Sequence, residues 1–171
     1  MNASEVSSKE YLPYYANYIK EAGLVDLIDG LENGFERTLL FFKSIPDDKL
    51  EYQYATHKWT IKEIIQHLID TERIMAYRAL RFAREDKTPL PSFEENSYAK
   101  TSFANTRSKE NLIEEYTALK NSTVFMFKSF SKEMLKKIGV ASNGEMSVRA
   151  LGFVIIGHES HHCRVIRERY L

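Results

Sequence analysis

The segment TIKEIIQHLIDTERIMAYRALRFAR, residues 60–84, decides the predicted fold. Thr60 can cap its first turn and Glu63 can reach back to the cap, which is a capping box. Apolar residues then recur at helical spacing, namely Ile61, Ile64, Ile65, Leu68, Met75, Ala79 and Phe82. The segment therefore predicts one long helix with a single buried stripe.

Three further segments repeat this pattern. The first stops at Pro46, and its apolar positions are Leu24, Leu27, Ile28, Leu31, Phe35, Leu39 and Phe42. The second runs from Ser108 to Phe130, and the last begins at a Ser147 cap and continues almost to Leu171. No strand alternation, internal repeat or interdomain linker is present. We therefore expect one all-α domain over residues 1–171, a four-helix bundle.

The connections between these helices are long. The one from Glu85 to Thr106 contains two prolines and little periodicity. It can shape a pocket, or it can be a plain surface loop. Simple up-down-up-down order is consequently not assured.

Composition excludes some classes of function. Lysine plus arginine equals aspartate plus glutamate, 24 each, so no basic footprint for nucleic acid or an anionic membrane is expected. The apolar runs are too short to cross a bilayer, and the N-terminal residues lack the pattern of a secretory signal. A cytoplasmic location is the expectation. Cys163 is the only cysteine, lies off the inward stripe of its helix, and is expected to be inert.

The last helix contains the sequence GHESHHCRVIRERYL, residues 157–171. At 100° per residue, His158 and His162 fall about 20° to either side of its apolar direction, and His161 lies at the edge. Two neighbouring imidazoles in an apolar stripe need partners. They can be hydrogen-bonded core residues, or an i, i+4 pair can bind one metal ion, and zinc, nickel and iron all suit imidazole.

The letters HESHH also match H-E-x-x-H, the zinc-protease signature, with Glu159 as base. Such proteases take a third ligand from downstream of the motif. Only nine residues follow His162, and none is a histidine. A protease of this type is therefore disfavoured, and the third ligand must come from upstream.

Two upstream histidines remain. His57 is expected in a solvated loop. His67 lies roughly 40–60° beyond the edge of its helix's stripe and can border a cavity between two helices. Glu72 lies inside that stripe, where a carboxylate needs a partner such as Arg169, a histidine ligand to support, or a proton. Asp70 is expected at the surface.

Together these stretches resemble the DinB/YfiT-like family of metal-dependent enzymes. The likeness rests on PYYANYI, KWTIKEIIQHLIDTERIMAYRALRFARED, TPLPSFEENSYA and GHESHHCRVIRERYL, in this order and spacing. It implies a bundle of up-down-down-up topology, often a homodimer. It also implies a divalent metal ion, Zn, Ni or Fe, on the ligands His67, His158 and His162.

The resemblance leaves the reaction open. Members include thiol-dependent S-transferases that use bacillithiol or mycothiol, along with hydrolases and isomerases. A transferase or related hydrolase acting on a small molecule is the first hypothesis, and Glu72, Glu159 and His161 are the candidates to support the ligands or move protons. A non-catalytic stress-response protein that binds a metal or ligand is the alternative. DNA binding is disfavoured by the neutral charge.

Overall fold

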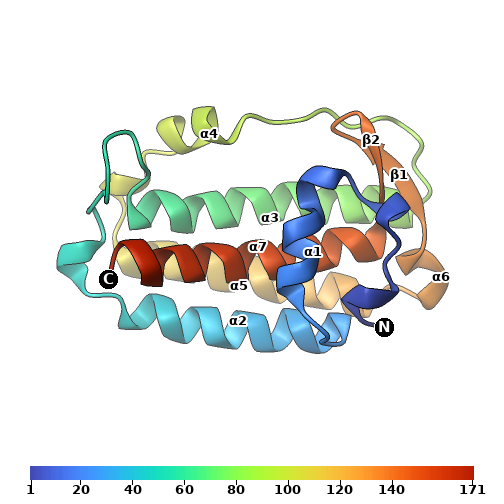
Figure 1. Cartoon of the computed structure of the whole chain (residues 1–171), viewed down its shortest axis with the longest axis horizontal. Helices are drawn as coiled ribbons and strands as arrows, with labels where there is room; N and C mark the ends of the chain where they lie inside the picture. The colour runs from blue at the N-terminus through green and yellow to red at the C-terminus, as the bar shows by residue number, and fades with distance from the viewer.

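Four long helices form the body of the protein in the computed structural model, which describes residues 1–171 (Figure 1). They are α2 (Leu27–Ser44), α3 (Ile61–Ala83), α5 (Lys109–Lys128) and α7 (Val148–Arg169). The predicted all-α four-helix bundle is confirmed, and each helix lies within a few residues of its predicted bounds. Leu24 is the exception among the predicted inward residues, because it precedes α2 and is 80% exposed.

The helices follow up-down-down-up order. α2 and α7 run towards the end of the molecule that carries the C-terminus, and α3 and α5 run the opposite way (Figure 1). α7 packs between α2 and α3 on one side of the bundle, and α5 packs between the same two helices on the other. Because α3 and α5 are parallel, the chain must return along the whole bundle between them.

Side-chain caps set where the helices begin. Thr60 accepts a hydrogen bond from the backbone of Glu63 at 3.1 Å, and the Glu63 carboxylate accepts one from Thr60 at 2.7 Å. Ser147 caps α7 through the backbone N–H of Ala150 at 3.1 Å. The polar residues before each apolar run therefore satisfy backbone donors that a helix leaves free.

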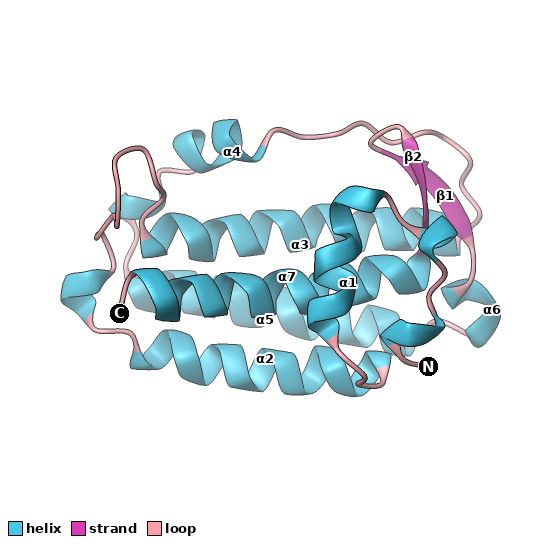
Figure 2. Ribbon diagram, in the orientation of Figure 1, coloured by secondary structure: helices cyan, strands magenta, loops and turns pink.

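Several short elements were not predicted. They are α1 (Ala16–Ala22), α4 (Glu95–Thr101), α6 (Lys132–Leu135), strands β1 (Ile138–Ala141) and β2 (Gly144–Ser147), and 3₁₀ turns at Ala3–Glu5, Ser8–Glu10, Pro13–Tyr15, Asp47–Lys49 and Ala104–Thr106. The expectation of no strand is wrong, since β1 and β2 form an antiparallel hairpin (Figure 2). Its tip residues Ser142 and Asn143 both have positive φ, as tight hairpin turns require. Four-residue strands are too short to show an alternating pattern.

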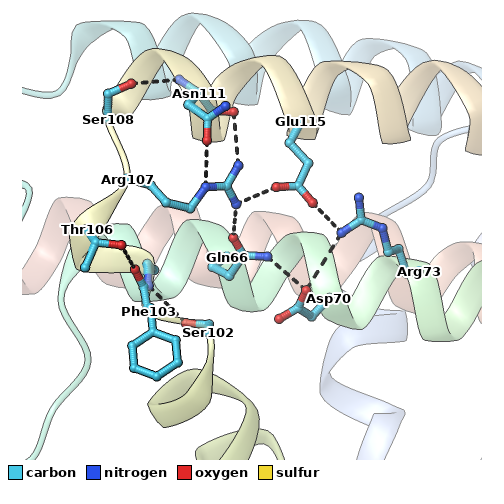
Figure 3. A network of polar contacts seen from close by, with 11 residues as sticks. Gln66, Asp70, Arg73, Ser102, Phe103, Thr106, Arg107, Ser108, Asn111 and Glu115 are labelled. Atoms are coloured by element: carbon cyan, nitrogen blue, oxygen red, sulfur yellow. Dashed lines mark hydrogen bonds and ion pairs between the residues drawn. The ribbon is translucent and has the colours of Figure 1, made fainter.

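The crossover from α3 to α5 is held at its far end by a polar network (Figure 3). Arg107 donates to the side chains of Gln66 and Asn111 and pairs with Glu115. Glu115 also pairs with Arg73, and Asp70 accepts a hydrogen bond from Gln66 at 2.9 Å. Asp70 is half-buried beside Arg73, in line with its predicted role as a surface or ion-paired group.

α1 crosses α7 at a glycine. A Cβ atom at Gly157 would lie 1.8 Å from the backbone oxygen of Tyr18, so only glycine allows this close approach. The contact brings the N-terminal tyrosines beside His158, the residue that follows Gly157. No helix combines the length and apolar character needed to cross a membrane.

The buried apolar residues form two clusters, of 25 and 14 residues, towards the two ends of the bundle. Buried polar side chains gather in the layer between them. This polar layer takes residues from all four long helices, namely Thr38, His67, Thr71, Glu72, Lys120, Thr123, His158 and Glu159. Because burying polar groups is costly without partners, the layer is where the fold must accommodate either a network or a ligand.

Candidate metal centre

Three imidazoles converge between α3 and α7. The Nε2 atom of His67 lies 3.0 Å from that of His158, and His162 Nε2 lies 3.1 Å from the same atom. One nitrogen from each ring lies within 4.8 Å of the other two. His67 and His158 are buried, and His162 is partly exposed. His67 is therefore set as deeply as His158, deeper than its position on the helix predicted.

The donor set fits a metal ion better than it fits hydrogen bonding. Each neutral imidazole has one N–H, so three nitrogens that face one point cannot all find a matching donor or acceptor in one another. Around a tetrahedral zinc ion, nitrogens at 2.0–2.1 Å are about 3.3 Å apart, close to the spacing of the two contacting pairs. An i, i+4 pair on α7 with a third ring from α3 thus has the donor type and spacing that a divalent-cation site requires.

The imidazoles are neutral, the form that binds metals. Burial lowers the pKa of His67 to about 4. Burial, followed by the neighbouring imidazoles, holds the pKa values of His158 and His162 well below the ordinary 6.5. At neutral pH each ring therefore keeps one nitrogen lone pair that a cation can bind.

Flanking groups fix the rings. Thr71 Oγ1 lies 3.5 Å from His67 Nδ1, one helical turn along α3. The Trp59 ring lies 4.6 Å from that of His67, and the Tyr18 ring meets His158 edge-on at 5.1 Å, both between ring centroids. The far nitrogen of His162 is buried without a hydrogen-bond partner. The contacts with Thr71, Trp59 and Tyr18 therefore restrict the orientations of the His67 and His158 rings.

A cavity of about 410 Å³ opens beside the histidines. It is the size of a small-molecule site. Its lining is mainly apolar and aromatic: Leu12, Tyr14, Tyr15, Tyr18, Trp59, His67, Thr71, Met75, Phe93, Glu95, Ser142, Val154, His158 and His162. Phe93 and Glu95 belong to the crossover between α3 and α5, so this connection shapes the pocket.

Glu72 and Glu159, the two acidic candidates, lie deeper in the polar layer. Lys120 Nζ of α5 pairs with Glu72 at 3.0 Å and with Glu159 at 2.6 Å, and all three side chains are buried. Burial raises the pKa of Glu72, and although burial alone would lower the pKa of Lys120, Glu159 and Glu72 raise it. The partner of Glu72 is Lys120, whereas Arg169, one of the predicted possibilities, is exposed.

Glu159 is fully engaged by its neighbours. Thr38 donates to Oε1 at 2.9 Å and Tyr116 donates to Oε2 at 2.7 Å, in addition to the Lys120 pair. A carboxylate held in this way is not free to serve as a base at the histidines. This geometry argues against the zinc-protease interpretation of HESHH.

Glu72 approaches the histidines from the core side. Its Oε1 atom is buried and has no hydrogen-bond partner. A second, small cavity of about 10 Å³ lies between Glu72, Glu159, Thr71 and His158. This space is about that of one water molecule, and Glu72 and His158 both line it.

The sequence profile of the DinB superfamily matches residues 31–166, a span that contains all three histidines. The chain belongs to the DinB superfamily. A protein of Oceanobacillus iheyensis named a "putative metal-dependent hydrolase" is 27% identical over 126 residues, 72% of each chain. YfiT from Bacillus subtilis, described as a "probable metal-dependent hydrolase with an unusual four-helix bundle topology", superimposes with a TM-score of 0.73. The alignment covers 93% of this chain and 91% of YfiT at 15% identity, and it shows the shared fold.

The remaining histidines lie outside the centre of this DinB bundle. His161 is partly exposed and faces α1, with its Nδ1 3.4 Å from a Glu21 oxygen. His57 is exposed in a loop, where it was expected. Cys163 is buried rather than directed off the core, and its sulfur lies 3.6 Å from Thr38 Oγ1. α7 is covered by α1, α2 and α3, so a single inward stripe understates how much of it is buried.

Sequence reasoning missed Lys120 and Thr38 of the polar layer, and Trp59 and Tyr18 of the pocket. Lys120 had a detectable signal, because it lies four residues after Tyr116 and three before Thr123 on the inward stripe of α5. Trp59 packs its ring on that of His67. It precedes the helix, so helical periodicity carries no information about it.

Proposed function

We propose that this chain is a metal-dependent hydrolase that binds one divalent ion through His67, His158 and His162. The observation that carries the proposal is the convergence of three neutral imidazoles, from two helices, at the wall of a cavity of about 410 Å³. Three protein ligands leave coordination positions for water or substrate, whereas structural zinc sites usually close all four. Zinc, nickel and iron each suit this donor set.

The chemistry of hydrolysis would come from the ion and the positioning from the chain. A divalent ion bound there would polarise a carbonyl and lower the pKa of a coordinated water. The aromatic wall limits access of bulk water, and Trp59 and Tyr18 hold the ligand rings in place. The Glu72–Lys120–Glu159 group sets two carboxyl groups against one ammonium, so ionisation of both would leave a buried negative charge that favours a cation nearby.

Thiol S-transfer is the second candidate. An open divalent ion can also bind a thiolate, and DinB relatives with this activity are known from the resemblance described above. The pocket lining counts against it, because it contains no lysine or arginine to pair with the carboxylates of bacillithiol. Hydrolysis is therefore the function that the site supports better.

A non-catalytic metal-binding protein is the alternative from another class. It predicts a fourth protein ligand that closes the coordination sphere. The group of candidate ligand residues consists of the three histidines alone, and it borders a cavity. This arrangement favours an exchangeable position and hence an enzyme. A small-molecule substrate and a homodimer, both expected from the resemblance, belong to the same proposal.

The test combines metal analysis with activity. Purified protein is assayed against a panel of small esters and amides, then after chelation, and again after return of zinc, nickel or iron. We expect hydrolysis that is lost on chelation and restored by one metal. A parallel assay supplies bacillithiol with an electrophile panel. Thiol transfer without hydrolysis would replace the first candidate by the second, and one tightly bound metal ion without either activity would favour the binding protein.

A further inference from the structure

Aromatic rings from outside the four long helices form much of the cavity wall. Tyr14, Tyr15 and Tyr18 come from the N-terminal segment, and Phe93 comes from the crossover. The Tyr14 ring lies 5.0 Å from that of Tyr15 and 6.3 Å from that of Tyr18, both edge-on. Tyr14 is 65% exposed, so it marks the rim of the cavity. Aromatic faces carry negative charge density that attracts cations.

One charged side chain lines the cavity, and it is acidic. Glu95, at the start of α4, is half-buried and makes neither a hydrogen bond nor an ion pair. Its neighbour Glu94 does not line the cavity and caps α4, accepting a hydrogen bond from the Ser97 backbone at 2.8 Å. The two adjacent carboxylates therefore have different roles: one completes the helix and the other is left facing the pocket.

Glu95 lies close to the tyrosines of the rim. Burial raises the pKa values of Tyr14 and Tyr18, and the Glu95 carboxylate raises both further. Other acidic groups on this side of the molecule already have cationic partners, since Glu21 pairs with Arg164 and Glu10 with Arg149. The rim thus combines two aromatic rings with an unpaired negative charge.

We propose that the cavity accepts substrates that carry an ammonium group, which binds between Tyr14, Tyr18 and Glu95 while the hydrolysed bond lies at the histidines. This inference rests on the proposed function for the reaction, and on the rim for the substrate class. Tyr18 joins the two ends, because its ring also contacts the ring of His158 at 5.1 Å.

A matched pair of probes tests the charge preference. Choline and 3,3-dimethyl-1-butanol have nearly the same shape, and only choline is charged. Trp59 is the only tryptophan and lines the cavity, so its fluorescence reports binding of either probe. We expect choline to bind about tenfold more tightly than the alcohol, the scale of a cation held by aromatic rings and a carboxylate.

Variants separate the charge from the shape. Glu95→Gln and Tyr14→Leu should each reduce the preference for choline over the alcohol at least threefold. Glu94→Gln is the matched control and should keep the preference. Equal affinities for the two probes in the wild type, or a preference that survives Glu95→Gln, would overturn the inference.

The proposed function and this inference can fail separately. Both probes carry the same hydroxyl, so any contact of that group with a metal is common to the two, and the titrations are run on zinc-loaded and on chelator-treated protein. A preference for choline in both states supports the inference even if no hydrolysis is found. Hydrolysis without any preference for choline would leave the metal centre standing and remove the substrate class.

Discussion

α3 and α7 each place two kinds of polar residue in the middle of the bundle, and the two kinds have different surroundings. His67 and His158 face a cavity and one another, and their nitrogens converge on one point. Glu72 and Glu159 face Lys120, which pairs with both. The same helices thus carry histidines that face a cavity and carboxylates that are paired within the chain. The comparison teaches that a buried polar residue indicates a ligand only when the chain supplies no hydrogen-bonding or charged partner for that residue.

The largest effect should be the loss of metal binding when a histidine of the three-histidine cluster is replaced. His158 Nε2 contacts both other imidazoles, so His158→Ala should remove most of the bound metal and lower metal affinity at least about a hundredfold, more than loss of a supporting residue. His67→Ala and His162→Ala should act in the same direction. Metal-to-protein ratios by mass spectrometry measure this, with His161→Ala and His57→Ala as controls that lose much less. Full stoichiometry in His158→Ala would overturn the centre.

Loss of a partner within the Glu72–Lys120–Glu159 group should instead lower the stability of the folded protein. Lys120→Met leaves two buried carboxylates without their cation, so it should lower the free energy of unfolding by about 3–5 kcal/mol. Lys128→Met removes a cation from an exposed pair with Glu32 on neighbouring helices and should cost about 0–1 kcal/mol. Urea denaturation compares the two. Similar values for both variants would mean that Lys120 is not a structural partner.

The effect of Glu72→Gln on the free energy of unfolding should depend on pH. The pKa of Glu72 in the folded protein lies above its ordinary 4.5, mainly because of burial. Its contribution to stability is therefore greatest below pH 4.5 and is lost as pH rises through the raised pKa. Relative to the wild type, Glu72→Gln should become more stable as pH increases. Unfolding free energies from pH 4 to pH 8 measure this trend, and a constant or opposite difference would contradict it.

The smallest effect on metal binding is expected from replacement of Cys163, which lies beside Thr38 and does not line the cavity. Burial raises the pKa of its thiol to about 11, so little thiolate exists at neutral pH. A thiol reagent at pH 8 should label the native protein at least about a hundredfold more slowly than the unfolded protein. Cys163→Ala should retain its metal. Rapid native labelling, or metal loss in this variant, would place the thiol at the centre after all.

Helical periodicity predicted most of the bundle and the three central histidines, because both depend on which side of a helix a residue occupies. It placed His158 and His162 in the core, and it placed His67 beyond the edge of its helix's stripe, where it could border a cavity between two helices. Topology was implied by the resemblance and not by the pattern, since helix order depends on how connections pack. The metal role of the histidines stays a prediction for the experiments above.

What the pattern could not supply lies outside regular helices or depends on several elements at once. Trp59 and Tyr18 reach the centre from segments whose positions are set by tertiary packing, such as the contact of α1 with Gly157. The hairpin of β1 and β2 is set by two residues with positive φ in a stretch too short to alternate. Burial of Cys163 requires helices on several sides of α7, which a single stripe does not describe.

The sequence distance across the histidine cluster has a consequence for how the protein matures. His67 and His158 are 91 residues apart, and the whole crossover and all of α5 lie between them. Bringing the two residues together closes a long loop, which costs conformational entropy. This cost arises before the contact between the two rings can stabilise the fold. An ion bound there acts as a cross-link between distant parts of the chain. Because α7 is the last long helix to be synthesised, an ion could bind to the three histidines only after the ribosome has made α7. The bound ion would then stabilise the completed fold.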